Sequence, residues 1–101
     1  MPWHAIASLE ECSPGEAREC VVAGRMVALF NVAGQFFALD GICPHQGGPL
    51  GKGALSGCVV TCPWHGFQFD VRSGLHSSTP NLRQPSFPTK VVENSVFVEL
   101  P

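Results

Sequence analysis

Two short segments rich in proline and glycine each carry one cysteine and one histidine, and this pattern constrains the fold more than any other. The segments are Cys43-Pro44-His45 and Cys62-Pro63-Trp64-His65. Thiolate and imidazole are the ligands that soft and borderline transition metals select. Four such side chains from two separated segments require a scaffold that holds two loops side by side, and we expect those loops at about residues 41–50 and 61–70.

The cysteine count argues against a disulfide framework. The chain contains five cysteines, and an odd number cannot all be paired within one chain. The N-terminal residues show no basic stretch followed by an apolar run of signal-peptide length. No apolar stretch approaches the length that spans a bilayer. We therefore expect a cytoplasmic protein with reduced thiols and no membrane contact.

Length and composition point to one ordered domain over residues 1–101. Charged residues make up 14% and hydrophobic residues 45% of the sequence, which excludes a long disordered chain. The formal net charge of −2 provides no electrostatic attraction for nucleic acid or an anionic membrane. Nucleic acid is therefore not an expected partner.

The pattern of apolar residues and turns predicts an all-β fold. Valine- and phenylalanine-rich runs alternate with tight turns such as Ala23-Gly24 and Ala33-Gly34, which is typical of hairpins. Ser8 to Glu11 resembles a capping box and predicts a single helical turn, and residues 77–90 are expected to form a loop. The expected strands are 19–22, 25–32, 35–39, 55–61, 67–71, 90–93 and 96–100. We predict a small antiparallel sandwich or barrel with a cluster-binding subdomain of two loops.

Two metal chemistries fit the four side chains. A structural zinc ion takes two cysteines and two histidines, although zinc fingers usually pair like ligands and place the histidines on a helix. A Rieske [2Fe–2S] centre has two histidines in place of two cysteines on one iron. The mixed Cys/His pairs and the Pro/Gly-rich surroundings favour the second geometry.

The residues around these pairs resemble a known family. The stretch Cys43 to His45, the stretch Cys62 to Asp70 and the following turn Arg72-Ser73-Gly74 resemble the Rieske signature. The whole chain is similar to Rieske-type ferredoxins, the electron-carrier components of bacterial aromatic-ring dioxygenase systems. The resemblance implies one [2Fe–2S] cluster, with Cys43 and Cys62 on the buried iron and His45 and His65 on the outer iron.

The resemblance also implies a role and partners. The protein would be an electron carrier, not an enzyme with catalytic residues of its own. It would take one electron from a flavin-dependent reductase and pass it to a terminal ring-hydroxylating oxygenase, as a monomer in transient contacts. Two alternatives remain open: the small Rieske subunit of an NADH nitrite reductase, which shares the fold, and a zinc-stabilised interaction module.

Four positions depart from the high-potential members of the family. Gly48 and Trp64 stand where those members carry a disulfide, and Phe67 and Phe69 stand where they carry hydroxyl donors to sulfur. Hydrogen bonds to sulfur stabilise the reduced state. We therefore expect a potential on the order of −150 mV, near the low end of the Rieske range. The remaining donors would be backbone N–H groups, for which the candidates are Gly47, Gly48, Gly66 and Gln68.

The other residues of these types have ordinary expected roles. Cys58 is expected to be a small buried hydrophobe, and His4 and His76 are expected at the surface. Trp64 fits a docking surface and plain packing equally well. The glutamates near the N-terminus are expected to form a solvated face.

Overall fold

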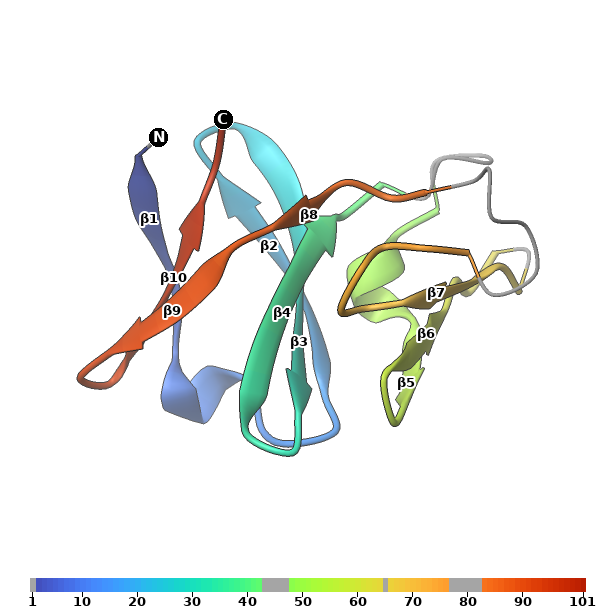
Figure 1. The fold of residues 1–101 in the computed structure, drawn as a ribbon, viewed down its shortest axis with the longest axis horizontal. Coiled ribbons are helices and arrows are strands. Elements are labelled where there is room, and N and C mark those ends of the chain that lie inside the picture. The colour runs from blue at the N-terminus through green and yellow to red at the C-terminus, as the bar shows by residue number, and fades with distance from the viewer. Residues whose placement is uncertain (1, 43–47, 65, 77–82) are drawn as a thin grey trace.

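A computed structural model describes residues 2–42, 48–64, 66–76 and 83–101. In these residues the chain forms short strands and two single turns of 3-10 helix, η1 (Leu9–Glu11) and η2 (Leu50–Lys52), with no α-helix (Figure 1). The strands are β1 (Trp3–Ser8), β2 (Ala17–Val22), β3 (Arg25–Val32), β4 (Gln35–Asp40), β5 (Ala54–Ser56), β6 (Val59–Thr61), β7 (Gln68–Asp70), β8 (Ser86–Phe87), β9 (Thr89–Val92) and β10 (Ser95–Glu99). The predicted all-β class is confirmed. The described part also holds no helix long and apolar enough to cross a membrane.

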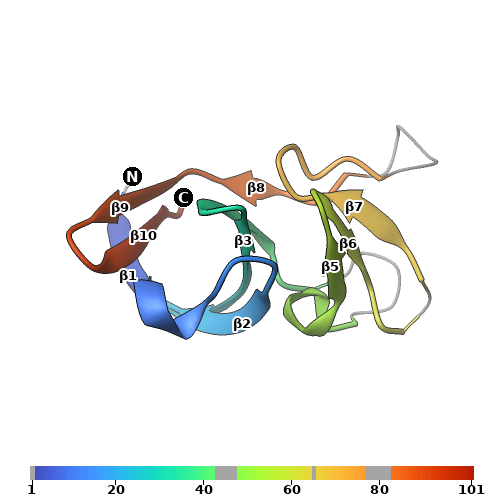
Figure 2. The ribbon, with the colours of Figure 1, turned by 90° about the horizontal axis from the view of Figure 1, so that it is seen from below.

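The strands form three antiparallel sheets, with the orders β1-β10-β9, β2-β3-β4-β8 and β5-β6-β7. β1 lies against β2, and β9 lies against β4, so the first two sheets curve around a shared interior (Figure 2). The small β5-β6-β7 sheet stands to one side of this barrel (Figures 1 and 2). It carries the second predicted ligand loop between β6 and β7.

Strand β3 is buried on both faces and joins two hydrophobic cores. Val27 and Leu29 point into the barrel, whereas Ala28 and Phe30 point towards the small sheet. All four are fully buried. A strand buried on both faces reads as a continuous apolar run, which is why this segment of the sequence is apolar without alternation.

The second core attaches the small sheet to the barrel. Its buried members come from β3 and β4, from η2 and from the small sheet and its ends: Ala28, Phe30, Leu39, Leu50, Val60, Cys62, Phe69 and Val71. Cys62, a predicted metal ligand, is therefore part of a packed core. Its position is fixed by the same contacts that hold the two halves of the molecule together.

The hairpins follow the predicted turns. Ala23 and Gly24 have φ values of 50° and 75°, and Ala33 and Gly34 have 51° and 93°. Positive φ at both central residues is the type I′ geometry, whose twist matches that of the flanking strands. The capping box at η1 is also present, with the Ser8 N–H donating to Oε1 of Glu11 at 2.8 Å.

Three expectations on secondary structure were wrong. β1 was not predicted, because it pairs only with β10 at the other end of the chain and its own pattern is weak. Residues 55–61 form two strands, because Gly57 adopts a φ of 59° and turns the chain. The expected loop 77–90 contains β8 and the start of β9 in its described part.

Candidate metal centre

Of the four predicted ligands, the structure describes only Cys62. Cys43, His45 and His65 lie outside the described residues. Cys62 is described and is 1% exposed. The described part of the site consists of Cys62 and the residues at the base of each loop.

The first loop is closed at its base. Ile42 and Pro49 form an antiparallel bridge, and the Leu50 N–H donates to the carbonyl of Gly41 at 3.0 Å. The described residues on either side of the first ligand segment, Ile42 and Pro49, therefore lie side by side at the end of β4.

The second loop is closed in the same way. The Cys62 N–H donates to the carbonyl of Phe67 at 2.8 Å, and the Gly66 N–H donates to the carbonyl of Cys62 at 3.1 Å. Gly66 has a φ of 71°, a conformation that glycine adopts without strain. The Gly66 N–H, expected as a donor to cluster sulfur, thus serves its own loop, whereas Gly47 lies outside the described residues.

Gly48 and Cys62 bring the two loops into contact. A Cβ placed on Gly48 would lie 2.8 Å from Sγ of Cys62 and 3.1 Å from Cγ of Trp64. Only a residue without a side chain permits this approach. Gly48 and Trp64, which stand where high-potential members carry a disulfide, therefore face one another. The backbone of Gly48 also packs closely against the Cys62 thiol. A buried thiol at the junction of two loops that each carry a histidine fits an iron–sulfur group.

Phe67, Phe69 and His76 pack beside the second loop. The His76 ring lies edge-on to both phenylalanines, with centroid distances of 5.0 Å to Phe67 and 5.3 Å to Phe69. Phe69 is fully buried, whereas His76, like His4, is partly exposed, so the His76 ring packs against the phenylalanines and still reaches the surface. Neither phenylalanine carries the hydroxyl group that high-potential members are expected to have at these two positions.

Apolar side chains are exposed around the loops. Trp64 is 58% exposed, Ile42 is 48% exposed and Leu75 is 40% exposed. Trp64 is therefore not a core residue, although its Cβ lies close to Gly48. Trp3, Val21, Val91 and Val92 are exposed large apolar residues elsewhere in the described chain, so exposure alone does not mark the loops as a contact surface.

A polar network braces the end of β4, where the first loop begins. One carboxylate oxygen of Asp40 accepts from the Ile42 N–H at 3.1 Å, and the other lies 3.5 Å from Nη2 of Arg25. The buried side-chain amide of Gln84 belongs to the same network. An isolated glutamine carries no motif, so no pattern in the sequence predicts this role of Gln84.

The expected solvated acidic face has local partners. Glu11 accepts from the Ser8 N–H and pairs with Arg18, and Glu10 accepts from the Asn94 side chain at 2.8 Å. The hydrogen bond from Asn94 lowers the pKa of Glu10, and that from Ser8 lowers the pKa of Glu11. These carboxylates therefore have structural roles at η1. Cys58 is half-buried, not buried as expected, and packs against the second core.

Comparison with known proteins identifies the family. The sequence model of the Rieske [2Fe-2S] domain family matches residues 2–93 of this chain. Ferredoxin CarAc of Metapseudomonas resinovorans is 32% identical over 98 residues, which cover 95% of this chain and 92% of that protein. Human apoptosis-inducing factor 3 is 36% identical over 95 residues, which cover 93% of this chain but only 16% of that protein.

Solved structures agree with this match. A chain of the complex of reduced oxygenase and oxidized ferredoxin in carbazole 1,9a-dioxygenase is 32% identical, with a TM-score of 0.86 over 95% of this chain and 91% of that chain. A chain from Mycobacterium tuberculosis that is assigned as an NADH-dependent nitrite reductase small subunit is 23% identical and shares the fold, with a TM-score of 0.88 over 96% of this chain and 93% of that chain. From its sequence, its two loops and its architecture, this chain belongs to the Rieske [2Fe-2S] domain family.

Proposed function

We propose that the protein is a Rieske-type ferredoxin that carries one electron at a time between a flavin-dependent reductase and a terminal ring-hydroxylating oxygenase. The observation that carries the proposal is the contact between the two loops at Gly48 and Cys62, within a chain of the Rieske family. The match to CarAc over nearly the full length of both proteins supports the ferredoxin role.

One [2Fe–2S] cluster would be held by Cys43, His45, Cys62 and His65. When bound, the cluster supplies a one-electron redox centre. Cys62 contributes a thiolate from a buried position, where the second core excludes water from its side chain. The closed bases of the two loops restrict the ligand positions, and this pre-organisation lowers the entropic cost of assembling the site. We propose a low potential, because the side chains of Phe67 and Phe69 carry no hydrogen-bond donor for sulfur.

Partner contact would occur at the loop end of the molecule. Ile42, Trp64 and Leu75, which we call the loop rim, are exposed apolar side chains; Ile42 directly precedes Cys43, and Trp64 lies between Cys62 and His65 in the sequence. Electron-transfer partners meet through small interfaces and separate again, and a rim of three apolar side chains suits such an encounter. We propose a monomer that docks by this rim.

We further propose that residues 1–101 form one domain and that the protein is cytoplasmic. Two cores that share β3 support one domain over residues 1–101. The described cysteines, Cys12, Cys20, Cys58 and Cys62, are all unbridged, in keeping with a cytoplasmic protein. The nitrite reductase subunit remains the second candidate, and a zinc-stabilised module the third.

Spectroscopy and metal analysis of the purified protein test the cluster. We expect a brown protein with two irons and two labile sulfides per chain and a rhombic electron paramagnetic resonance (EPR) spectrum on reduction. A colourless protein with one zinc ion would refute the proposal. Electron transfer to a ring-hydroxylating oxygenase, but not to a nitrite reductase large subunit, would separate the two redox candidates.

The loop rim is tested by a pair of tryptophan variants. Trp64→Ala should slow electron transfer to the oxygenase and leave the cluster spectrum unchanged. Trp3→Ala is the control, because Trp3 is 36% exposed and lies on β1, away from the loops (Figure 1). Equal transfer rates in both variants would exclude Trp64 from the docking surface.

A further inference from the structure

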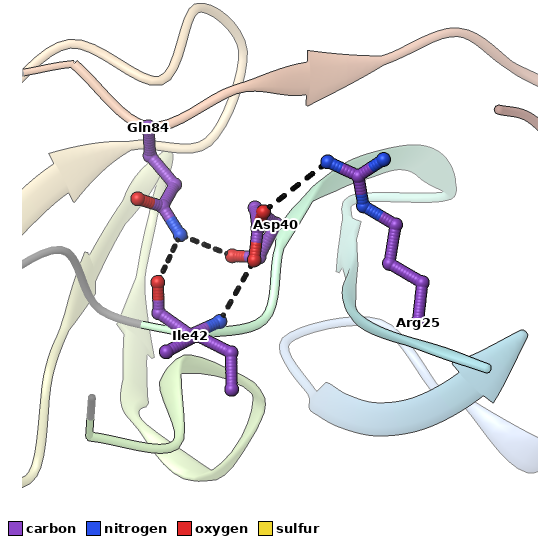
Figure 3. A network of polar contacts seen from close by, with 4 residues as sticks. All are labelled: Arg25, Asp40, Ile42 and Gln84. Atoms are coloured by element: carbon purple, nitrogen blue, oxygen red, sulfur yellow. Dashed lines mark hydrogen bonds and ion pairs between the residues drawn. The ribbon is translucent and has the colours of Figure 1, made fainter. Parts of the chain in front are cut away.

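Gln84 is one of two buried polar side chains in the described part of the chain, and it is 1% exposed. Its amide nitrogen donates to the carbonyl oxygen of Asp40 at 2.5 Å and to that of Ile42 at 2.6 Å (Figure 3). These carbonyls belong to the last residue of β4 and to the residue directly before Cys43. Both amide hydrogens of Gln84 are therefore used to hold the entry to the first ligand loop.

Ile42 is held at both of its backbone polar groups. Its N–H donates to Oδ1 of Asp40 at 3.1 Å, and its carbonyl accepts from Gln84 (Figure 3). Arg25 approaches the other carboxylate oxygen of Asp40 at 3.5 Å and so helps to orient the carboxylate. A backbone unit held at its donor and its acceptor has little freedom to rotate, so the direction in which the chain enters residue 43 is fixed.

The main chain of Gln84 contacts the support of the second ligand loop. Its N–H donates to the carbonyl of Gly74 at 2.7 Å, and the Gly74 N–H donates to the carbonyl of Asp70 at 2.7 Å. Asp70 ends β7, the strand that leaves the second loop. Gly74 has a φ of 81°, and a Cβ at this position would collide with the carbonyl oxygen of Gln84. Glycine is therefore required for this close approach.

Gln84 thus links two segments that support different ligand loops. Its side chain holds the entry to the first loop, and its backbone holds the turn after β7. We propose that Gln84 is a positioning residue that sets the spacing of the two loops and thereby controls how firmly, and in what geometry, the iron–sulfur cluster is held. This inference rests on the proposed function, because it requires the cluster to be present.

Gln84→Met tests the inference, because methionine has a similar length and no donor. We expect cluster loss to a chelator to become about tenfold faster, the factor that corresponds to ~1.4 kcal/mol and the order expected when two hydrogen bonds are removed. The EPR g-values and the midpoint potential should shift as well. Gln84→Asn keeps the amide on a shorter stem, and its rate should lie between those of the wild type and Gln84→Met.

Asn31→Leu is the matched control. Asn31 is the other buried polar side chain of the described residues, and its amide donates to the carbonyl of Cys12 at 2.9 Å. It serves the barrel core, so its loss should lower the melting temperature and leave the g-values, the potential and the rate of cluster loss unchanged. This control separates a general loss of stability from an effect on the cluster.

The outcomes decide between the two proposals. Gln84 variants with wild-type g-values, and with cluster loss no faster than in Asn31→Leu, would refute the positioning role. If Gln84→Met does not fold, the same comparison is made with Gln84→Asn. If the wild type holds no iron–sulfur cluster, the proposed function itself fails, whatever the variants do.

Discussion

Gly48 of the first loop lies so close to Cys62 of the second that a Cβ on Gly48 would stand 2.8 Å from the cysteine Sγ. The contact is tighter than side-chain carbons normally allow, so either the Cys62 side chain or one of the two loops must shift if Gly48 gains a methyl group. We therefore expect Gly48→Ala to bind the cluster more weakly and to change its EPR spectrum.

Gly51→Ala is the control for this substitution. A Cβ on Gly51 would lie 2.7 Å from Cα of Glu19, an equally close contact between η2 and β2. Overpacking of this kind typically costs about 1–3 kcal/mol, so both variants should be destabilised. Only Gly48→Ala should change the cluster spectrum, and identical spectra in the two variants would contradict the assigned role of the Gly48–Cys62 contact.

Cys62→Ser should remove a thiolate ligand, whereas Cys58→Ser should not. We expect at least about tenfold less cluster in Cys62→Ser, since changes to residues that only contact metal ligands already cost about 10–100-fold in affinity. Iron and labile sulfide per chain provide the measurement. Cys58 is half-buried at the β5–β6 turn of the same small sheet, so it controls for general damage to the sheet. Full occupancy in Cys62→Ser would show that Cys62 is not a ligand.

Ala33→Asn should stabilise the protein. Ala33 has a φ of 51°, and the left-handed region costs residues with a Cβ roughly 1–2 kcal/mol relative to the right-handed one. Asparagine is favoured at this position of a type I′ turn, so we expect the free energy of unfolding to rise by about 0.5–1 kcal/mol. Denaturant titration measures it. Ala54→Asn, on an exposed strand position, is the control and should give no gain.

The Asp70–Arg72 pair should make stability depend on acid pH. Hydrogen bonds from the Arg72 side chain, at 2.8 Å and 3.1 Å, lower the pKa of Asp70 from its ordinary value of 3.8. A lowered pKa in the folded state favours the ionised form, so the stabilisation is present above about pH 4 and is lost as the pH falls through the lowered pKa.

Arg72→Gln should therefore lower the melting temperature at pH 6 by a few degrees, and this difference should shrink towards pH 3. Arg83→Gln is the control, because the guanidinium of Arg83 donates to the carbonyl of Ser73 and forms no ion pair with the carboxylates of the described residues. A wild-type advantage over Arg72→Gln that persists unchanged at pH 3 would contradict the assigned origin of the shift.

Two thiols of the barrel should resist alkylation. Burial raises the pKa of both Cys12 and Cys20, and the thiolate is the reactive form. We expect iodoacetamide at pH 8 to modify the half-buried Cys58 first and to reach Cys12 and Cys20 only after unfolding. Mass spectrometry of the alkylated peptides measures the order, and early labelling of Cys12 would show that the barrel core opens readily.

The parts of the fold that were predicted correctly depend on short-range patterns. The hairpin from β2 to β4 follows from two Ala-Gly turns between apolar runs, and the range of β3, Arg25–Val32, was predicted in full. The metal-binding pattern depends on residue types at fixed spacing, which the printed sequence displays directly. The parts that were missed, β1 and β8, are strands whose partners lie far away in the chain, and β8 is only two residues long.

The sequence by itself determined the all-β class, the turns that form the hairpins and the Cys/His pattern of the two loops, because each depends on neighbouring residues. Only the tertiary structure decided that Gly48 meets Cys62, that His76 packs against Phe67 and Phe69, and that Gln84 holds the entry to the first loop from 44 residues away. The physical reason is that these contacts arise from the packing of distant segments. A glycine or a glutamine has no local pattern that reveals which distant backbone it will approach.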